Sequence, residues 1–151
     1  MKQNVNHIDH VIWICKPENQ SAYVKQLSEL CNVRFHGPVD KESLGVRIYI
    51  SWAAGLEVVT PLSDSNPNAK SLQTHLNERG EGILGVVFGV PDIGEGRTRA
   101  QGLGYPVSDI IENVGDEPYV HETECMKEVI VGNIASSLFI LGEIRYADNL
   151  L

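Results

Sequence analysis

Long apolar runs, paired cysteine motifs and clusters of basic residues are all missing from this sequence of 151 residues. No apolar stretch approaches the roughly 20 residues of a membrane-spanning helix, so we expect no membrane partner. The chain has 12 Lys and Arg residues against 20 Asp and Glu residues, which gives a net charge of −8. Because its basic residues form no cluster, nucleic acid is also set aside as a partner.

The three cysteines, Cys15, Cys31 and Cys125, are an odd number and form no CxxC pair. This pattern favours reduced thiols in a cytoplasmic protein, and buried packing is their more frequent role. Residues 1–6 lack the apolar core of a secretory signal, which agrees with a cytoplasmic location. Hydrophobic residues make up 42% of the chain, enough for a globular protein with a core of useful size.

The stretch Ile8–Cys15 alternates about a single histidine. In an extended strand one face would carry Ile8, His10, Ile12 and Ile14, and the other Asp9, Val11, Trp13 and Cys15. A histidine in an apolar row is costly unless it is hydrogen-bonded or metal-bound. Residues 83–90 partly repeat this stretch and place Gly85 where His10 stands. The first copy of the repeat therefore has a histidine at this position, and the second copy has a glycine.

The rest of the pattern predicts strand, helix, three strands, a connecting helix, and then strand, helix and three strands again. In the first half we expect a helix that starts at Pro17 and ends near Asn32, strands at 33–35, 46–51 and 56–61, and a loop at 36–42. Asn66 and Pro67 should start the connecting helix, which Gly80 closes. In the second half we expect a strand at 83–90, a helix at 92–102 weakened by Gly94 and Gly96, strands at 107–111, 128–131 and 138–144, and a polar loop at 113–123.

Five short stretches, taken in order, resemble the vicinal oxygen chelate superfamily of glyoxalases, bleomycin-resistance proteins and ring-cleaving dioxygenases. They are Ile8–Val11, Gly55–Leu62, Ala69–Leu72, Gly80–Ile83 and Val90–Ile93. The likeness is greatest to the methylmalonyl-CoA epimerase branch. The resemblance implies an α+β fold with two βαβββ modules, related by a pseudo-twofold axis, around a cleft that usually holds a divalent metal. It predicts one domain, 1–151, with modules of about 7–62 and 82–146 and a helical connector at 63–81.

The metal ligands implied by this resemblance are incomplete. His10 matches the histidine of the first module, and Glu57 stands where that branch has a glutamine or glutamate. The second histidine is replaced by Gly85, and the final glutamate falls at Leu141 unless a slip of two residues brings in Glu143. His10, Glu57 and Glu143 would suit Mn, Co, Ni, Fe or Zn, and we expect such a metal to be weakly held or absent. Without a metal, His10 and Glu57 would form a buried hydrogen-bonded pair.

Other residues are candidates for acid–base chemistry or for contact with a substrate. His121 lies in a dense polar stretch, 121–125, whose histidine and glutamate could act as acid and base over a cleft; the alternative is a solvated polar loop. The residues that could contact a substrate are Trp13, Ile48, Gly85 and Leu141, although tryptophan is more often part of the core. Glycine at 85 removes a ligand and is expected to leave space in the cleft floor.

Three functions remain open on the sequence alone. The first is a lyase, isomerase or epimerase that forms an enolate-type intermediate on a small carboxylate, acyl-thioester or aromatic metabolite, with a metal polarising the carbonyl. The second is a metal-free protein that binds or sequesters a small molecule, as resistance proteins do. The third is a metal-free enzyme that uses His10 and Glu57 as acid and base. We also expect a homodimer, because sheets of this type leave edges to be covered.

Overall fold

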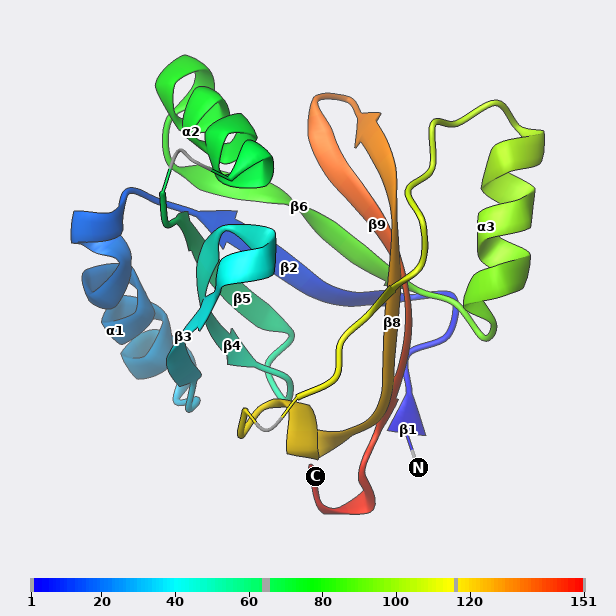
Figure 1. Ribbon diagram of the computed structural model, residues 1–151. Helices are drawn as coiled ribbons and strands as arrows, with labels where there is room; N and C mark the ends of the chain where they lie inside the picture. Colours follow the sequence, from blue (N-terminus) through cyan, green and yellow to red (C-terminus); the bar gives the residue numbers. More distant parts are fainter. Residues whose placement is uncertain (1, 64–65, 116, 151) are drawn as a thin grey trace. The chain divides into compact units, whose positions relative to one another are not determined.

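The computed structural model describes residues 2–63, 66–115 and 117–150 (Figure 1). Contacts divide the chain into two compact units, Ile12–Ile83 and Met1–Val11 with Leu84–Leu151. We call them the α1 unit and the α3 unit, after the helices that they contain. The boundary falls within strands β2 (Ile8–Ile14) and β6 (Gly82–Gly89), so both strands contribute to each unit. One domain with a pseudo-twofold axis between its modules remains a prediction.

The α1 unit repeats the predicted order of strand, helix and three strands. After β2 come α1 (Gln20–Cys31), β3 (His36–Lys41), β4 (Val46–Ser51), β5 (Leu56–Pro61) and α2 (Pro67–Arg79). The strands lie in the order β3-β4-β5-β2, in which β4 is antiparallel to both β3 and β5. The first strand therefore lies beside the last, as in a βαβββ module.

Helix α1 is held against one face of this sheet by apolar packing and by one buried amide. Cys15, Val24 and Val58 form a buried cluster, and Trp13 and Leu27 pack against it. Gln20 donates from Nε2 to the carbonyl oxygens of Arg47 at 2.9 Å and of Val58 at 3.1 Å. Since Gln20 is only 3% exposed, these bonds fix the start of α1 on β4 and β5.

The α3 unit contains β6, α3 (Ile93–Gly102), β7 (Ile111–Glu112), β8 (Thr123–Ile134) and β9 (Ser137–Tyr146). Its strands lie in the order β6-β9-β8-β7, and β6 runs parallel to β9. The short strand β1 (Lys2–Gln3) pairs with the end of β9. Each unit thus has the succession of strand, helix and three strands that the sequence predicted.

The two glycines that weaken α3 do not prevent the helix. Its first turn is capped by Asp92, whose Oδ1 accepts from the backbone N–H of Glu95 at 2.8 Å. Gly96 is buried, and a Cβ added there would lie 3.3 Å from the Leu141 side chain. The missing side chain at 96 therefore lets the helix lie close to β9, which offsets a propensity cost of roughly 1 kcal/mol.

Several predicted strand positions were wrong. The segment 33–35 is not a strand, and β3 occupies His36–Lys41, where a loop was expected. In the second half β7 is reduced to Ile111–Glu112, whereas β8 extends back to Thr123. Both errors have one cause, since β3 and the first half of β8 are polar strands ordered by pairing with β4 and β9, distant in the chain.

The cysteines differ in exposure. Cys15 is buried, Cys125 is half-buried and Cys31 is exposed, so buried packing was the wrong expectation for Cys31. Among the residues that the structure describes, no helix has the length and apolar character to cross a membrane.

Candidate functional site

A buried polar network in the α3 unit surrounds His10. The ring atom Nδ1 of His10 lies 2.7 Å from Oδ1 of Asp9, and the Tyr146 hydroxyl donates to the same oxygen at 2.6 Å. Asn4 donates from Nδ2 to the other carboxylate oxygen at 3.3 Å. The exposed fractions are 5% for Asp9, 1% for His10 and 2% for Tyr146. A buried carboxylate is thus held by three donors from three parts of the chain.

The network fixes the chemistry of the histidine ring. Because a carboxylate only accepts hydrogen bonds, Nδ1 of His10 carries the proton of the neutral ring, and Nε2 carries the basic lone pair. Burial and the neighbouring Asp9 raise the pKa of Tyr146, so its hydroxyl stays protonated and remains a donor. The arrangement can orient an imidazole and stabilise its protonated form.

Sequence reasoning found His10 but missed Asp9 and Tyr146. Alternation along a regular strand puts Asp9 on the face opposite His10, so the contact between adjacent side chains was not expected. Tyr146 lies 137 positions after Asp9 and carries no sequence signal of its role. The adjacent Asp-His pair was the only available clue, since a carboxylate next to a buried histidine is a common way to orient its ring.

Glu57 and Ile48 belong to the α1 unit, so their distance from His10 remains a prediction. Glu57 lies opposite Ile50 in the antiparallel pair of β4 and β5, and Ile48 lies opposite Val59. Their neighbours Val58 and Tyr49 belong to the cluster under α1. Since successive side chains on a strand alternate, Glu57 and Ile48 share the face turned away from α1.

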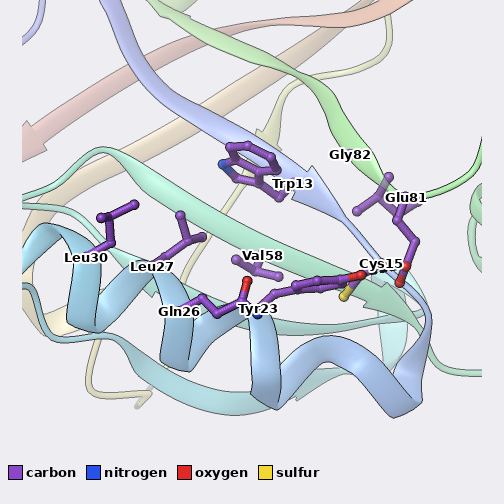
Figure 2. A pocket seen from close by; sticks show the side chains of 10 residues that line it. Trp13, Cys15, Tyr23, Gln26, Leu27, Leu30, Val58, Glu81 and Gly82 are labelled. Atoms are coloured by element: carbon purple, nitrogen blue, oxygen red, sulfur yellow. Dashed lines mark hydrogen bonds between the residues drawn. The ribbon is translucent and has the colours of Figure 1, made fainter.

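Trp13 lies on the opposite face from those two residues. It packs with Leu27 of α1 on the Cys15 cluster and lines a cavity beside the helix (Figure 2). The structure therefore separates Trp13 from Ile48 within the α1 unit, although both were candidates for contact with one substrate.

Glu143 has partners that occupy both of its carboxylate oxygens. Oε2 accepts from the backbone N–H of Ile93, the first residue of α3, at 2.9 Å. Oε1 accepts from Arg145. The carboxylate is 8% exposed and faces the positive end of the helix dipole. These contacts give Glu143 a role in fixing α3 on β9, which does not fit the expected metal ligand.

Leu141 lies on the same side of β9 as Glu143. It packs with Val90, Ile93 and Val129 in the cluster beneath α3. The expectation that the two residues share a strand face is confirmed, and that face is the one covered by the helix.

Gly85 does not open space beside its strand. It lies opposite Leu138 in the parallel pair of β6 and β9. A Cβ added at Gly85 would lie 2.0 Å from the Leu138 carbonyl oxygen, so the neighbouring backbone fills the position of the missing side chain. The expected extra room in the floor of a cleft is absent here.

His121 lies on a short 3₁₀ turn, Val120–Glu122, and is exposed. The polar stretch 121–125 is only partly a loop, because β8 begins at Thr123. Its role as acid or base stays a prediction.

The acidic, histidine and cysteine side chains are spread too widely to form a metal cluster in the part of the chain that the structure describes. Within 2–63, 66–115 and 117–150 no group of three or more His, Cys, Asp and Glu side chains is placed to hold one ion. His10 offers the carboxylate-supported ring that metal sites use. Glu143, however, is committed to Arg145 and Ile93. The described side chains therefore do not supply the usual three protein ligands of a metal site. Binding of a metal is weakly supported at most.

Comparison with known proteins defines the fold. No protein-family model and no curated protein matches the sequence. A solved structure of methylmalonyl-CoA epimerase from Streptomyces coelicolor, in complex with 2-nitronate-propionyl-CoA, matches 92% of this chain and 97% of its own, with 17% identity and a TM-score of 0.67. The chain has the glyoxalase-like fold. The fold implied by the resemblance to the vicinal oxygen chelate superfamily is thus confirmed.

Two further neighbours agree with this assignment. Methylmalonyl-CoA epimerase from Mycobacterium tuberculosis covers 99% of this chain and 94% of its own, with 16% identity and a TM-score of 0.66. A hypothetical protein from Bacillus halodurans covers 94% and 96%, with 19% identity and a TM-score of 0.68. At these identities the glyoxalase-like fold is shared, and the activity has to be argued from the site.

Proposed function

We propose that this protein is an epimerase-like enzyme that removes a proton next to the carbonyl group of a small carboxylate or acyl-thioester. The observation that carries the proposal is the buried pair of His10 and Asp9, anchored by the Tyr146 hydroxyl. The neighbours support the substrate class, because one methylmalonyl-CoA epimerase is described in complex with methylmalonyl-CoA.

In the proposed reaction Nε2 of His10 is the base. The carbon–hydrogen bond breaks, its electron pair enters the enolate, and the proton moves to Nε2. Asp9 stabilises the imidazolium ring that results, and Tyr146 is a positioning residue that holds the Asp9 carboxylate. Return of a proton to the opposite face of the enolate completes an epimerisation.

Exchange of the substrate proton with solvent tests this proposal. The protein is incubated with methylmalonyl-CoA in D₂O, and the deuterium incorporated at the carbon between the carbonyls is measured by mass spectrometry. Removal of a general base costs about 10²–10⁴-fold in rate, so His10→Gln should lose most of the exchange. His75→Ala on α2 is the control and should keep the wild-type rate, because His75 lies in the other unit on the connecting helix. Wild-type exchange in His10→Gln would refute the assignment.

The same measurement tests the need for a metal. Exchange is compared in protein treated with a chelator and in the same protein after addition of Mn²⁺, Co²⁺, Ni²⁺, Fe²⁺ or Zn²⁺. We expect less than stoichiometric metal by elemental analysis of the treated protein. Tightly bound, near-stoichiometric metal after chelation would contradict the expected weak binding. It would favour a metal-dependent reaction instead.

A second candidate function is metal-free binding of a small molecule. The burial of His10 favours it, because a ring that is 1% exposed also fits a purely structural network. A binding protein would hold acyl-thioesters or small carboxylates without any deuterium exchange, and His10→Gln would then change stability alone.

We also propose a homodimer. The strand order begins with β3 and ends with β7, and a second copy could cover these edge strands. Sedimentation at micromolar concentration should show twice the monomer mass of 16.7 kDa, and a purely monomeric species would contradict this.

A further inference from the structure

The first residues of the chain, 2–7, lie on the α3 unit as an N-terminal strap. Its strand β1 pairs with the end of β9, where Lys2 lies opposite Tyr146 (Figure 1). The side chain of Gln3 donates from Nε2 to the carbonyl oxygen of Val90 at 2.8 Å. The strap is therefore fixed to the strand that carries the tyrosine of the buried polar network.

The second half of the strap lies against Gly89, the last residue of β6. The backbone N–H of Asn6 donates to the carbonyl oxygen of Gly89 at 2.8 Å, and the N–H of Gly89 donates to that of His7 at 2.8 Å. A Cβ added at Gly89 would lie 1.4 Å from the carbonyl oxygen of Asn4, and real Cβ contacts are not shorter than 3.0 Å. The missing side chain at 89 thus lets the strap lie directly on β6.

One side chain of the strap reaches the buried carboxylate of Asp9. Nδ2 of Asn4 donates to Oδ2 of Asp9 at 3.3 Å. The other oxygen, Oδ1, faces the ring of His10 and accepts from the hydroxyl of Tyr146. Because hydrogen bonds depend on distance and angle, bonds to both oxygens fix the plane of the carboxylate relative to the imidazole ring.

We propose that Asn4 and Gly89 are positioning residues for the reaction at His10. The strap docks on Gly89 and orients the Asp9 carboxylate through Asn4, which keeps the proton of the neutral His10 ring on Nδ1 and leaves Nε2 as the base. The inference rests on the proposed function. It gives neither positioning residue a contact with the substrate, so their loss should lower kcat for deuterium exchange and leave KM unchanged.

Gly89→Ala tests the docking of the strap. The added methyl group must push the strap away from β6, and a misplacement of about 1 Å can cost 10²-fold in rate, so kcat should fall at least about tenfold. Gly102→Ala is the matched control in the same unit. Among the described residues, nothing outside its own helix and chain neighbours comes within 4 Å of a Cβ added at Gly102, so kcat should stay at the wild-type value.

Asn4→Ala tests the hydrogen bond, and it keeps the inference testable if Gly89→Ala does not fold. Loss of a hydrogen bond to a charged group should lower kcat about tenfold. In an Asp9→Asn background the carboxylate is already gone, so the added Asn4→Ala should change kcat by less than about twofold. Asn133→Ala, at an exposed position of the same unit, is the control and should keep the wild-type kcat.

The ring of His10 gives a readout that needs no activity. Its ¹⁵N chemical shifts show which nitrogen of the neutral ring carries the proton. In the wild type this should be Nδ1, which faces Asp9. In Gly89→Ala and in Asn4→Ala the tautomer with the proton on Nε2 should appear, because the carboxylate is no longer held on both oxygens. The two control variants should keep the wild-type signals.

Three results would each overturn the inference. They are a wild-type kcat in folded Gly89→Ala, an equal cost of Asn4→Ala with and without Asp9→Asn, and an unchanged His10 tautomer in both strap variants. Absence of exchange in the wild-type protein would instead refute the proposed function. The His10 signals would then still decide whether the strap holds the ring in one tautomer.

Discussion

Tyr146→Phe should lower the free energy of unfolding by about 1.5–3 kcal/mol, the range for a hydrogen bond to a charged group. The hydroxyl lies 2.6 Å from Oδ1 of Asp9, and both side chains are at least nine-tenths buried. Phenylalanine preserves the ring packing, so the loss isolates the hydroxyl. In a chain of this size 1 kcal/mol shifts Tm by about 2–4 °C, which predicts a fall of about 3–12 °C.

The assay is thermal and urea unfolding of the wild type, Tyr146→Phe and a matched control, Tyr105→Phe. Tyr105 is 43% exposed, so its hydroxyl is expected to change stability by less than about 0.5 kcal/mol. If Tyr146→Phe were as stable as this control, the Asp9 network would not be a stabilising feature, and the orientation of His10 would need another explanation.

The pH dependence gives an independent check on the same residue. The folded state raises the pKa of Tyr146 above that of the unfolded chain, so folding holds this proton more tightly. Its contribution to stability is complete below about pH 10 and is lost as the pH rises further, because only the unfolded chain then releases the proton. The stability difference between wild type and Tyr146→Phe should therefore narrow above about pH 10.

Four further changes have defined outcomes. Glu143→Gln should reduce stability by about 1 kcal/mol, measured by urea unfolding, because the charge at the first turn of α3 is lost. Asn66→Ala should cost about 1 kcal/mol in the same assay, since its side chain accepts from two backbone N–H groups of α2, and an unchanged midpoint would contradict this cap. Folding raises the pKa of Cys15 to about 12, so the free energy of unfolding of the wild type should fall between about pH 9 and 12, by at most about 1.4 kcal/mol per pH unit. Cys15→Ala should reduce this slope. Alkylation of native protein at pH 8, followed by peptide mapping, should modify the exposed Cys31 before Cys15, and the reverse order would be inconsistent with the structure.

The metal-ligand prediction shows where sequence reasoning stopped. Register along the last strand correctly put Leu141 and Glu143 on one face, because side chains alternate in any strand. Which side of the sheet that face meets depended on α3, whose first N–H binds Glu143. Alternation shows which residues share a strand face, but it does not show what covers that face. The sequence alone therefore did not distinguish a face that lines a cleft from one that a helix covers.

The features determined by the sequence are local ones. Capping by Asn66, the helical spacing before Asn32 and the order of elements in each βαβββ module depend on residues close together in the chain. Such preferences are set by nearby backbone hydrogen bonds and by the period of the apolar residues, both legible in one sequence.

The tertiary structure decided everything that joins distant segments. The polar strand β3 and the polar first half of β8 are ordered by their partners, because polar residues there show no alternation with apolar ones. The partner of His10 was settled by folding as well, since Tyr146 meets Asp9 across 137 positions. A buried carboxylate takes whichever donors the fold brings within reach, and only the packed chain determines which those are.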